Sequence, residues 1–217
     1  MKIHHIAEQN SILHHFLTEI RDANFQNDRM RFRRNIERIG EILAYEISKS
    51  FQYKPVDVPT PLGVKHTAAF EDDVVLCSIL RAGLPLHRGF LNYYDHAENG
   101  FISAYRHHYN HDDLFTIKVE YQAIPSLDNK TVLLIDPMLA TGQSIVAVYE
   151  QIVSKFAIKD LHIAVVIAAP EGIELLNQNL PDSVHLWVAS VDEGLNDKKY
   201  IVPGLGDAGD LAYGSKL

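Results

Sequence analysis

The feature that most constrains the fold is a series of short apolar segments that begins after Asp72 and alternates with helical stretches. The apolar segments read VVLCSIL, FISAY, TVLLID, LHIAVVIAA and VHLWVAS. Between the later apolar segments lie two stretches with a helical pattern, GQSIVAVYEQIVSKF and PEGIELLNQNL. Strands that are apolar on both faces, with helices between them, are typical of a mainly parallel sheet covered on both sides. The sequence therefore predicts a doubly wound α/β fold, flanked by helices.

Three further parts of the chain have patterns of their own. Residues 11–50 carry two amphipathic helical patterns, so the N-terminal helices of residues 1–53 are expected to form core or a subunit interface through side chains such as Phe16, Leu17, Phe32 and Ile36. The proline-rich segment 54–63 is expected to be a loop, with an edge strand left open. Residues 107–126 are polar and then β-rich, which favours a protruding β-hairpin over another core strand.

The bulk properties set limits on what the chain does. The 217 residues suit one domain spanning 1–217, and the formal net charge of −8 disfavours broad nucleic-acid binding. No apolar stretch approaches the ~18 residues of a membrane span, and no signal peptide is recognisable at the N-terminus. Cys77 is a single cysteine inside an apolar run, which indicates a buried thiol and favours the cytoplasm.

The segment LLIDPMLATGQS, from Leu133 to Ser144, has the pattern of an anion site. An apolar strand leads to Asp136, and a helix begins near Gly142, where free backbone N–H groups and a positive dipole end favour a phosphate. Asp136 would repel the phosphate itself but could accept hydrogen bonds from sugar hydroxyls, so a sugar phosphate is the expected ligand. The P-loop and the Rossmann fingerprint are both excluded, because neither glycine pattern is present. Taken alone, the same residues also suit an ordinary helix cap after a strand.

Three other motifs have chemistry that suits ligand binding. Arg81 follows a buried strand in SILRAGLP, where a guanidinium can bind pyrophosphate oxygens in parallel pairs; the alternative is an ion pair with Asp72 or Asp73. Arg106 is placed in the same way after ISAY. The segment YIVPGLGDAGD holds three glycines within six residues, which predicts an irregular loop whose backbone can donate and accept hydrogen bonds.

Together these motifs resemble a known family. DPMLATG, with proline in place of the common second acid, is similar to the phosphoribosyl pyrophosphate (PRPP) signature of the type I phosphoribosyltransferases, and of the uracil phosphoribosyltransferases in particular. Four other segments occur along the chain in the order typical of that family: ILRAG, YR, AAPEGI and YIVPGLGDAGD. The resemblance extends from about Arg29 to the C-terminus.

The resemblance implies a reaction and a set of site residues. The reaction transfers the phosphoribosyl group of PRPP to N1 of uracil, giving UMP and pyrophosphate. The implied catalytic residues are Asp136, Arg81, Arg106 and Asp207. The implied PRPP-binding residues are Arg81, Arg106, Asp136, Pro137, Met138, Leu139, Ala140, Thr141, Gly142, Gln143, Ser144 and Asp207. The implied uracil-binding residues, within the loop and C-terminus of 200–217, are Ile201, Gly206, Asp207 and Ala208.

The resemblance also implies cofactors and partners. Mg²⁺ is expected to be held mainly by PRPP itself, near Asp207 at most, because Pro137 supplies no second carboxylate. GTP is a possible effector. The apolar N-terminal helices, rather than the resemblance, indicate a homodimer or higher oligomer. Departures at Ser78, Gln143, Leu211 and Tyr213 concern affinity and regulation more than chemistry.

Three alternatives remain open at this point. The chain could be a non-catalytic nucleotide sensor that binds RNA, although a basic face is then expected. It could transfer phosphoribose to another base, although the glycine loop disfavours a purine. The histidine clusters at 4–5, 14–15 and 107–111 could bind a metal, but no cysteine accompanies them, so solvated side chains are the favoured interpretation.

Overall fold

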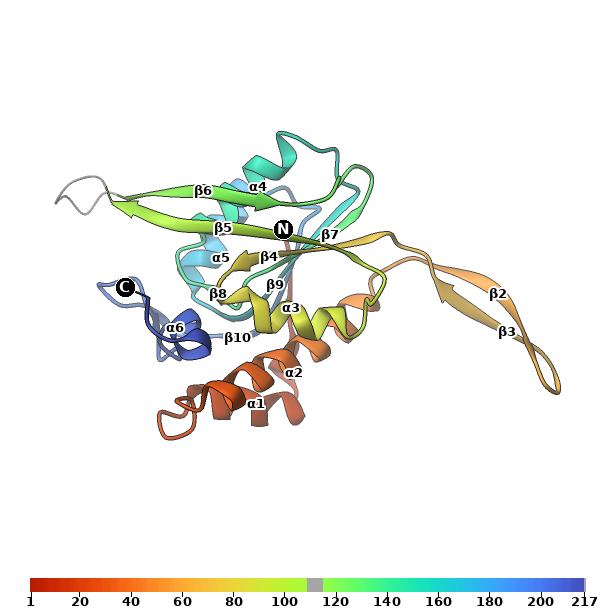
Figure 1. Ribbon diagram of the computed structural model, residues 1–217, viewed down its shortest axis with the longest axis horizontal. Coiled ribbons are helices and arrows are strands. Elements are labelled where there is room, and N and C mark those ends of the chain that lie inside the picture. The colour runs from red at the N-terminus through yellow and green to blue at the C-terminus, as the bar shows by residue number, and fades with distance from the viewer. Residues whose placement is uncertain (109–114, 217) are drawn as a thin grey trace.

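The computed structural model describes residues 1–108 and 115–216, and it describes the side chains of these residues outside 105–108 and 115–119. A central sheet runs through the body of the molecule, with helices on both faces (Figure 1). Its strands are β1 (Lys2–His5), β4 (Val74–Leu80), β5 (Glu98–His108), β6 (Phe115–Ala123), β7 (Thr131–Ile135), β8 (Met138–Leu139), β9 (Asp160–Ala168) and β10 (His185–Val191). The prediction of a mainly parallel, doubly wound sheet is confirmed.

The strand order places a reversal of the winding at the centre of the sheet. The order is β1-β10-β9-β7-β4-β5-β6, with β8 paired to β9, and every pair is parallel except β5 with β6. From β4 the chain moves outward to β5 and β6, and it then returns to the other side of β4 to form β7, β9 and β10. The crevice between the carboxyl ends of β4 and β7 is therefore the switch point at which open α/β sheets bind ligands.

Alternate side chains of the central strands fill two separate cores. On one face, Leu76 and Leu133 pack in a core that contains Ile20 and Phe32 from the N-terminal helices. On the other face, Val75, Val132 and their neighbours pack against the later helices. The helices are α1 (Ile12–Arg21), α2 (Arg29–Ser48), α3 (Gly83–Leu91), α4 (Gln143–Val153), α5 (Pro170–Asn179) and α6 (Ala208–Tyr213). The period-2 alternation of wholly apolar strands therefore supplies both layers.

The N-terminal region contains a strand as well as the two expected helices. β1 pairs in parallel with β10 at the edge of the sheet, and a short 3-10 turn, η1 (Ile6–Glu8), connects it toward α1. The strand KIHH has no apolar alternation, so its pairing with β10 could not be read from its own sequence. The apolar faces of α1 and α2 lie in the protein's own core, where Leu17, Phe32 and Ile36 are buried.

The proline-rich segment after α2 is a β-hairpin rather than a loop. β2 (Tyr53–Thr60) and β3 (Gly63–Phe70) pair antiparallel along their whole length. They project from the body on the side opposite α6 (Figure 1). Prolines 55 and 59 are tolerated because a two-stranded ribbon leaves half of its backbone N–H groups unpaired. This corrects the expectation for 54–63.

The hairpin predicted over 107–126 is present, and it is also part of the sheet. β6 pairs with β5 from Phe101↔Ala123 to His108↔Phe115, while β5 pairs with β4 only from Glu98 to Ser103. The first part of the β5–β6 pair is therefore the edge of the central sheet, and the remainder extends beyond β4. Both interpretations of this segment are partly right.

Candidate active site

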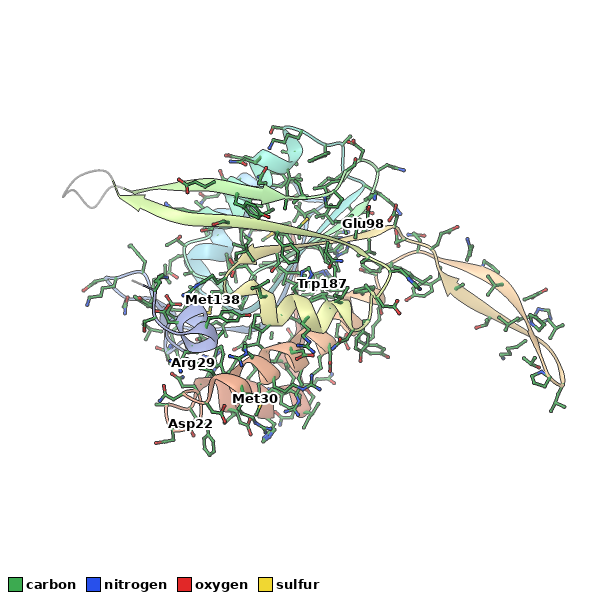
Figure 2. The ribbon with its side chains drawn as sticks, viewed as in Figure 1. Asp22, Arg29, Met30, Glu98, Met138 and Trp187 are labelled. Carbon is green, nitrogen blue, oxygen red and sulfur yellow. The ribbon has the colours of Figure 1, made fainter. Side chains whose placement is uncertain are left out.

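A cleft of about 580 Å³ opens at the switch point between β4 and β7. Its walls come from the ends of both strands, from the turn that precedes α4, and from the segment that leads into α6. Figure 2 labels Met138, one of the residues that line this cleft, and shows it near α6. Segments far apart in the sequence therefore meet at one place, as expected for a parallel sheet.

The turn between β7 and α4 forms one wall. Gly142 is the residue before α4 and has φ +81, and a Cβ atom there would lie 2.9 Å from the carbonyl oxygen of Gly172. Glycine therefore permits both the left-handed backbone and the close contact with α5. Thr141, Gly142 and Ser144 line the cleft beside the start of α4. The arrangement presents hydroxyl groups and the positive end of a helix to a ligand.

Of the members of the predicted PRPP set whose side chains the structure describes, two are not among those that line the cleft. The carbonyl oxygen of Pro137 accepts hydrogen bonds from the N–H groups of Val166 and Ile167, at 3.0 Å each, which fixes the turn against β9. Gln143 is exposed as the first residue of α4. The members of the set that do line the cleft are Arg81, Asp136, Met138, Leu139, Ala140, Thr141, Gly142, Ser144 and Asp207.

Asp136 immediately follows β7 at the base of the cleft. Its carboxylate accepts the N–H of Met138 at 3.1 Å. Burial raises the pKa of Asp136 to about 7, against an ordinary value of 3.8, and the hydrogen bond from Met138 opposes this shift only in part. A carboxyl group that titrates near neutrality in a cleft is typical of a functional site.

Arg81 faces α6 across the cleft. Its guanidinium donates to Asp210 Oδ1 at 2.8 Å and to the carbonyl oxygen of Gly214 at 3.4 Å. The alternative of an ion pair with Asp72 or Asp73 is wrong, because these two carboxylates pair with Lys159 and Lys130. The Arg81 side chain is 41% exposed, so the guanidinium can exchange a partner for a ligand oxygen.

The glycine-rich segment supplies the facing wall, with Ile201, Gly206, Asp207 and Ala208 all lining the cleft. Asp207 caps α6 by accepting the N–H of Asp210 at 2.9 Å, and Lys216 lies 3.3 Å from its other oxygen. Burial opposes the ionisation of Asp207, but these two partners together hold its pKa below the ordinary value. The structure therefore brings all four residues of the predicted uracil set together, and their role in binding uracil stays a prediction.

Three lysines of the cleft were not singled out from the sequence. Lys198 and Lys199 lie in the turn between β11 (Gly194–Leu195) and β12 (Ile201–Val202), and Lys216 follows α6. Asn196 shapes the turn, since its side-chain oxygen accepts the N–H groups of Lys198 and Tyr200 at 3.0 Å each. Lys199 has φ +63, which is uncommon outside glycine. The adjacent pair KK before YIVPG was the available signal.

Arg106 belongs to β5, where its backbone lies opposite Ile117. Its side chain, and those of His107 and His108, lie outside the described residues, as do positions 109–114. The prediction that Arg106 binds PRPP therefore stays a prediction.

The remaining histidines do not form a metal site within the described part of the chain. No group of three or more histidine, cysteine, aspartate or glutamate side chains there could hold a metal ion. His4 Nε2 lies 3.0 Å from His185 Nδ1, and the indole of Trp187 donates to His162 Nδ1 at 3.1 Å. Burial lowers the pKa of His162 to about 3, so this ring is neutral at pH 7, and burial also lowers the pKa values of His4 and His185.

No helix within residues 1–108 and 115–216 combines the length and the apolarity needed to cross a membrane.

Comparisons with known proteins agree with this arrangement. The family model described as uracil phosphoribosyltransferase matches residues 7–215. The chain is 48% identical over all 217 residues to a uracil phosphoribosyltransferase of Porphyromonas gingivalis, with both chains fully covered. It is 37% identical over 213 residues to the uracil phosphoribosyltransferase of Thermococcus gammatolerans, with 97% and 92% covered.

A solved structure shows the same architecture. The AQ2163 protein from Aquifex aeolicus superposes with a TM-score of 0.87 at 30% identity, and 99% of each chain is covered. The family match over residues 7–215, the two relatives and the motifs of the cleft therefore lead to one conclusion. This chain belongs to the uracil phosphoribosyltransferase family.

Proposed function

We propose that the protein transfers the 5-phosphoribosyl group of PRPP to N1 of uracil, giving UMP and pyrophosphate. The observation that carries the proposal is the cleft itself, in which the β7–α4 turn and the glycine-rich segment face each other at the switch point. The first wall suits a phosphate and the second suits a base. The activity named for the relatives favours uracil over another base and over a purely sensing role.

The residues of the cleft have distinct roles in this reaction. The backbone and hydroxyl groups of Ala140–Ser144 bind the 5-phosphate, while Arg81, with Arg106, binds the pyrophosphate. Asp136 accepts hydrogen bonds from the ribose hydroxyls and stabilises the positive charge that develops on the ring. Catalysis then comes from positioning and from preorganised charge, with no covalent intermediate on the protein.

The base is bound by the second wall. Uracil presents O2, N3–H and O4 along one edge, so backbone groups of residues 206–208, with Ile201 beside the ring, can bind it without a charged side chain. N1 then attacks the anomeric carbon from the face opposite the pyrophosphate, and the carbon–oxygen bond to the leaving group breaks with inversion.

Magnesium fits this site as part of the substrate. The carboxylates that line the cleft, Asp136 and Asp207, already accept hydrogen bonds from backbone N–H groups, and Asp207 also pairs with Lys216. Asp210, which does not line the cleft, pairs with Arg81. Mg²⁺ keeps much of its water and binds phosphate oxygens, so we propose that it enters with PRPP, near Asp207. It would neutralise charge on the leaving pyrophosphate.

We propose further that the protein forms a homodimer through the β2–β3 hairpin. An isolated two-stranded ribbon is marginally stable, yet Leu62 is fully exposed and Val64 is 61% exposed. A second copy of the chain can cover both ribbons by one two-fold contact.

We also propose that the enzyme works in the cytoplasm, which the unpaired Cys77 supports. We propose in addition that GTP is an effector, and an assay of UMP formation with and without GTP would test this.

UMP formation tests the proposed reaction. The purified protein is mixed with PRPP, uracil and Mg²⁺, and the product is identified by mass spectrometry. UMP formation that requires all three components supports the proposal. If PRPP binds but no UMP forms, the cleft serves to sense PRPP and the proposed reaction is wrong.

A further inference from the structure

Arg21 and Asp192 form an ion pair beside the glycine-rich segment. Arg21 is the last residue of α1, and Asp192 directly follows β10. The guanidinium donates to the two carboxylate oxygens at 2.6 and 2.7 Å, in the paired geometry that is strongest for these groups. The Asp192 side chain is 4% exposed and the Arg21 side chain is 22% exposed. The pair is therefore largely shielded from solvent.

Both members of the pair also bind one residue of the loop, Gly204. Arg21 donates to the carbonyl oxygen of Gly204 at 3.0 Å, and Asp192 accepts the N–H of Gly204 at 2.9 Å. Gly204 has φ +60, and a Cβ atom there would lie 2.1 Å from the carbonyl oxygen of Ile201. The backbone conformation at this position is thus fixed from both sides by charged groups.

The loop is held in place at neighbouring points as well. Arg21 donates to Ser190 Oγ at 3.1 Å, which ties the guanidinium to the end of β10. Gln26 donates to the carbonyl oxygen of Leu205 at 3.3 Å. Gly204 and Leu205 lie between Ile201 and Gly206, which line the cleft, whereas Arg21 and Asp192 do not line it. The pair therefore acts on the cleft through the loop.

We infer that Arg21 and Asp192 are positioning residues that hold residues 201–206 in the conformation that binds the base. This inference rests on the proposed function of the cleft. Replacing a shielded ion pair by apolar side chains is often neutral for stability, so a pair that serves only the fold could be dispensed with. This pair instead binds both the N–H and the carbonyl oxygen of Gly204, and it thereby fixes the position of the neighbouring loop residues. Uracil affinity should depend on the pair. PRPP affinity should not, because Asp207 is held separately by the N–H of Asp210 and by Lys216.

Kinetics of Arg21→Ala, Arg21→Lys and Asp192→Asn test the inference. We expect KM for uracil, at saturating PRPP, to rise about tenfold or more in Arg21→Ala and Asp192→Asn and less in Arg21→Lys, which keeps the charge. We expect Kd for PRPP, measured by calorimetry, to stay within twofold of the wild-type value. A cavity of about 520 Å³ adjoins Arg21, so millimolar ethylguanidinium should lower the uracil KM of Arg21→Ala again.

The ion pair between Glu19 and Arg31 provides the matched control. It joins α1 to α2 with two hydrogen bonds, at 2.7 and 2.9 Å, and within the described part of the chain neither side chain hydrogen-bonds to the glycine-rich loop. Arg31→Ala should lower the melting temperature with the uracil KM unchanged. The inference is overturned if Arg31→Ala raises the uracil KM as much as Arg21→Ala does, or if Arg21→Ala and Asp192→Asn leave it unchanged. An inactive wild-type protein would instead refute the proposed function. If Arg21→Ala does not fold, Asp192→Asn and Arg21→Lys decide between these outcomes.

Discussion

The pKa of the Asp136 carboxyl group predicts how the activity of the protein depends on pH. Below its pKa of about 7 the carboxyl group is neutral in the free protein and cannot stabilise positive charge on the ribose. We predict that kcat/KM for PRPP falls about tenfold per pH unit below pH 7. In Asp136→Asn, kcat should be lower than in wild type by about 10²-fold. The dependence of kcat/KM on pH in this variant should reflect only the ionisation of PRPP. Identical pH profiles for the two proteins would contradict this role.

The same pKa predicts how Asp136 affects stability. Between about pH 4 and pH 7 the folded protein keeps a proton on Asp136 that the unfolded chain has lost, so the free energy of unfolding contributed by this group falls as pH rises through that window. Asp136→Asn should therefore be more stable than wild type at pH 8, by on the order of 2 kcal/mol. The difference should vanish near pH 4. Urea denaturation at the two pH values measures both.

Lys199 combines an unusual backbone with a charge at the cleft. The left-handed conformation, φ +63, costs a non-glycine residue about 1 kcal/mol. Replacing Lys199 by glycine would remove this strain, and the gain would offset the larger conformational entropy that glycine loses on folding. Lys199→Gly should therefore leave stability within about 1 kcal/mol of wild type, while KM for PRPP rises severalfold with the loss of positive charge. Lys199→Gln keeps the strain and loses the charge, so it should show the same KM. Unchanged PRPP kinetics in both variants would exclude a role for Lys199 in binding.

At the scale of the elements, the contact between α2 and α3 is made by glycines. A Cβ atom on Gly89 would lie 2.1 Å from the carbonyl oxygen of Glu37, and one on Gly40 would lie 2.5 Å from that of Leu86. We predict that Gly89→Ala lowers the free energy of unfolding by about 3 kcal/mol, because the two helices must separate. Turnover of the folded protein at low temperature should be unchanged. A loss of less than about 1 kcal/mol would show that the helices adapt easily.

The β2–β3 hairpin predicts the oligomeric state. Leu62→Asp combined with Val64→Asp should convert a dimer into a monomer in light scattering, because two charges would then be desolvated at the contact. Ile12→Asp combined with Met30→Asp is the matched control, since these residues are 62% and 63% exposed on the N-terminal helices. Dissociation by the second pair alone would place the contact on the helices instead.

The elements also show what a sequence can and cannot predict. Strands such as VVLCSIL and TVLLID are apolar throughout, so their burial in a parallel sheet follows from composition alone. β1 and the β2–β3 hairpin could not be predicted in this way. The pairing of KIHH depends on β10, which lies about 180 residues away, and the exposed ribbon has no core face to impose a pattern.

At the scale of the whole molecule, the winding of the sheet brings the site together. Arg81 and Asp136 follow β4 and β7, which are neighbours only because the chain reverses direction across the sheet at that point. The motifs indicated many of the residues that line the cleft, because each follows a recognisable strand or turn, but not Lys198, Lys199 or Lys216. They did not predict that Arg81 pairs with Asp210 or that Arg21 reaches Gly204, since these contacts join segments 129 and 183 residues apart.

The most direct test of the account is the choice of base. Release of pyrophosphate from PRPP and Mg²⁺ is measured with uracil, cytosine, hypoxanthine and adenine in turn, and kcat/KM is determined for each. We predict release with uracil at least 10³-fold more efficient than with the others, because the backbone groups proposed to bind the base would be left partly unpaired by any edge other than O2, N3–H and O4 of uracil. Comparable or faster release with a purine would contradict it.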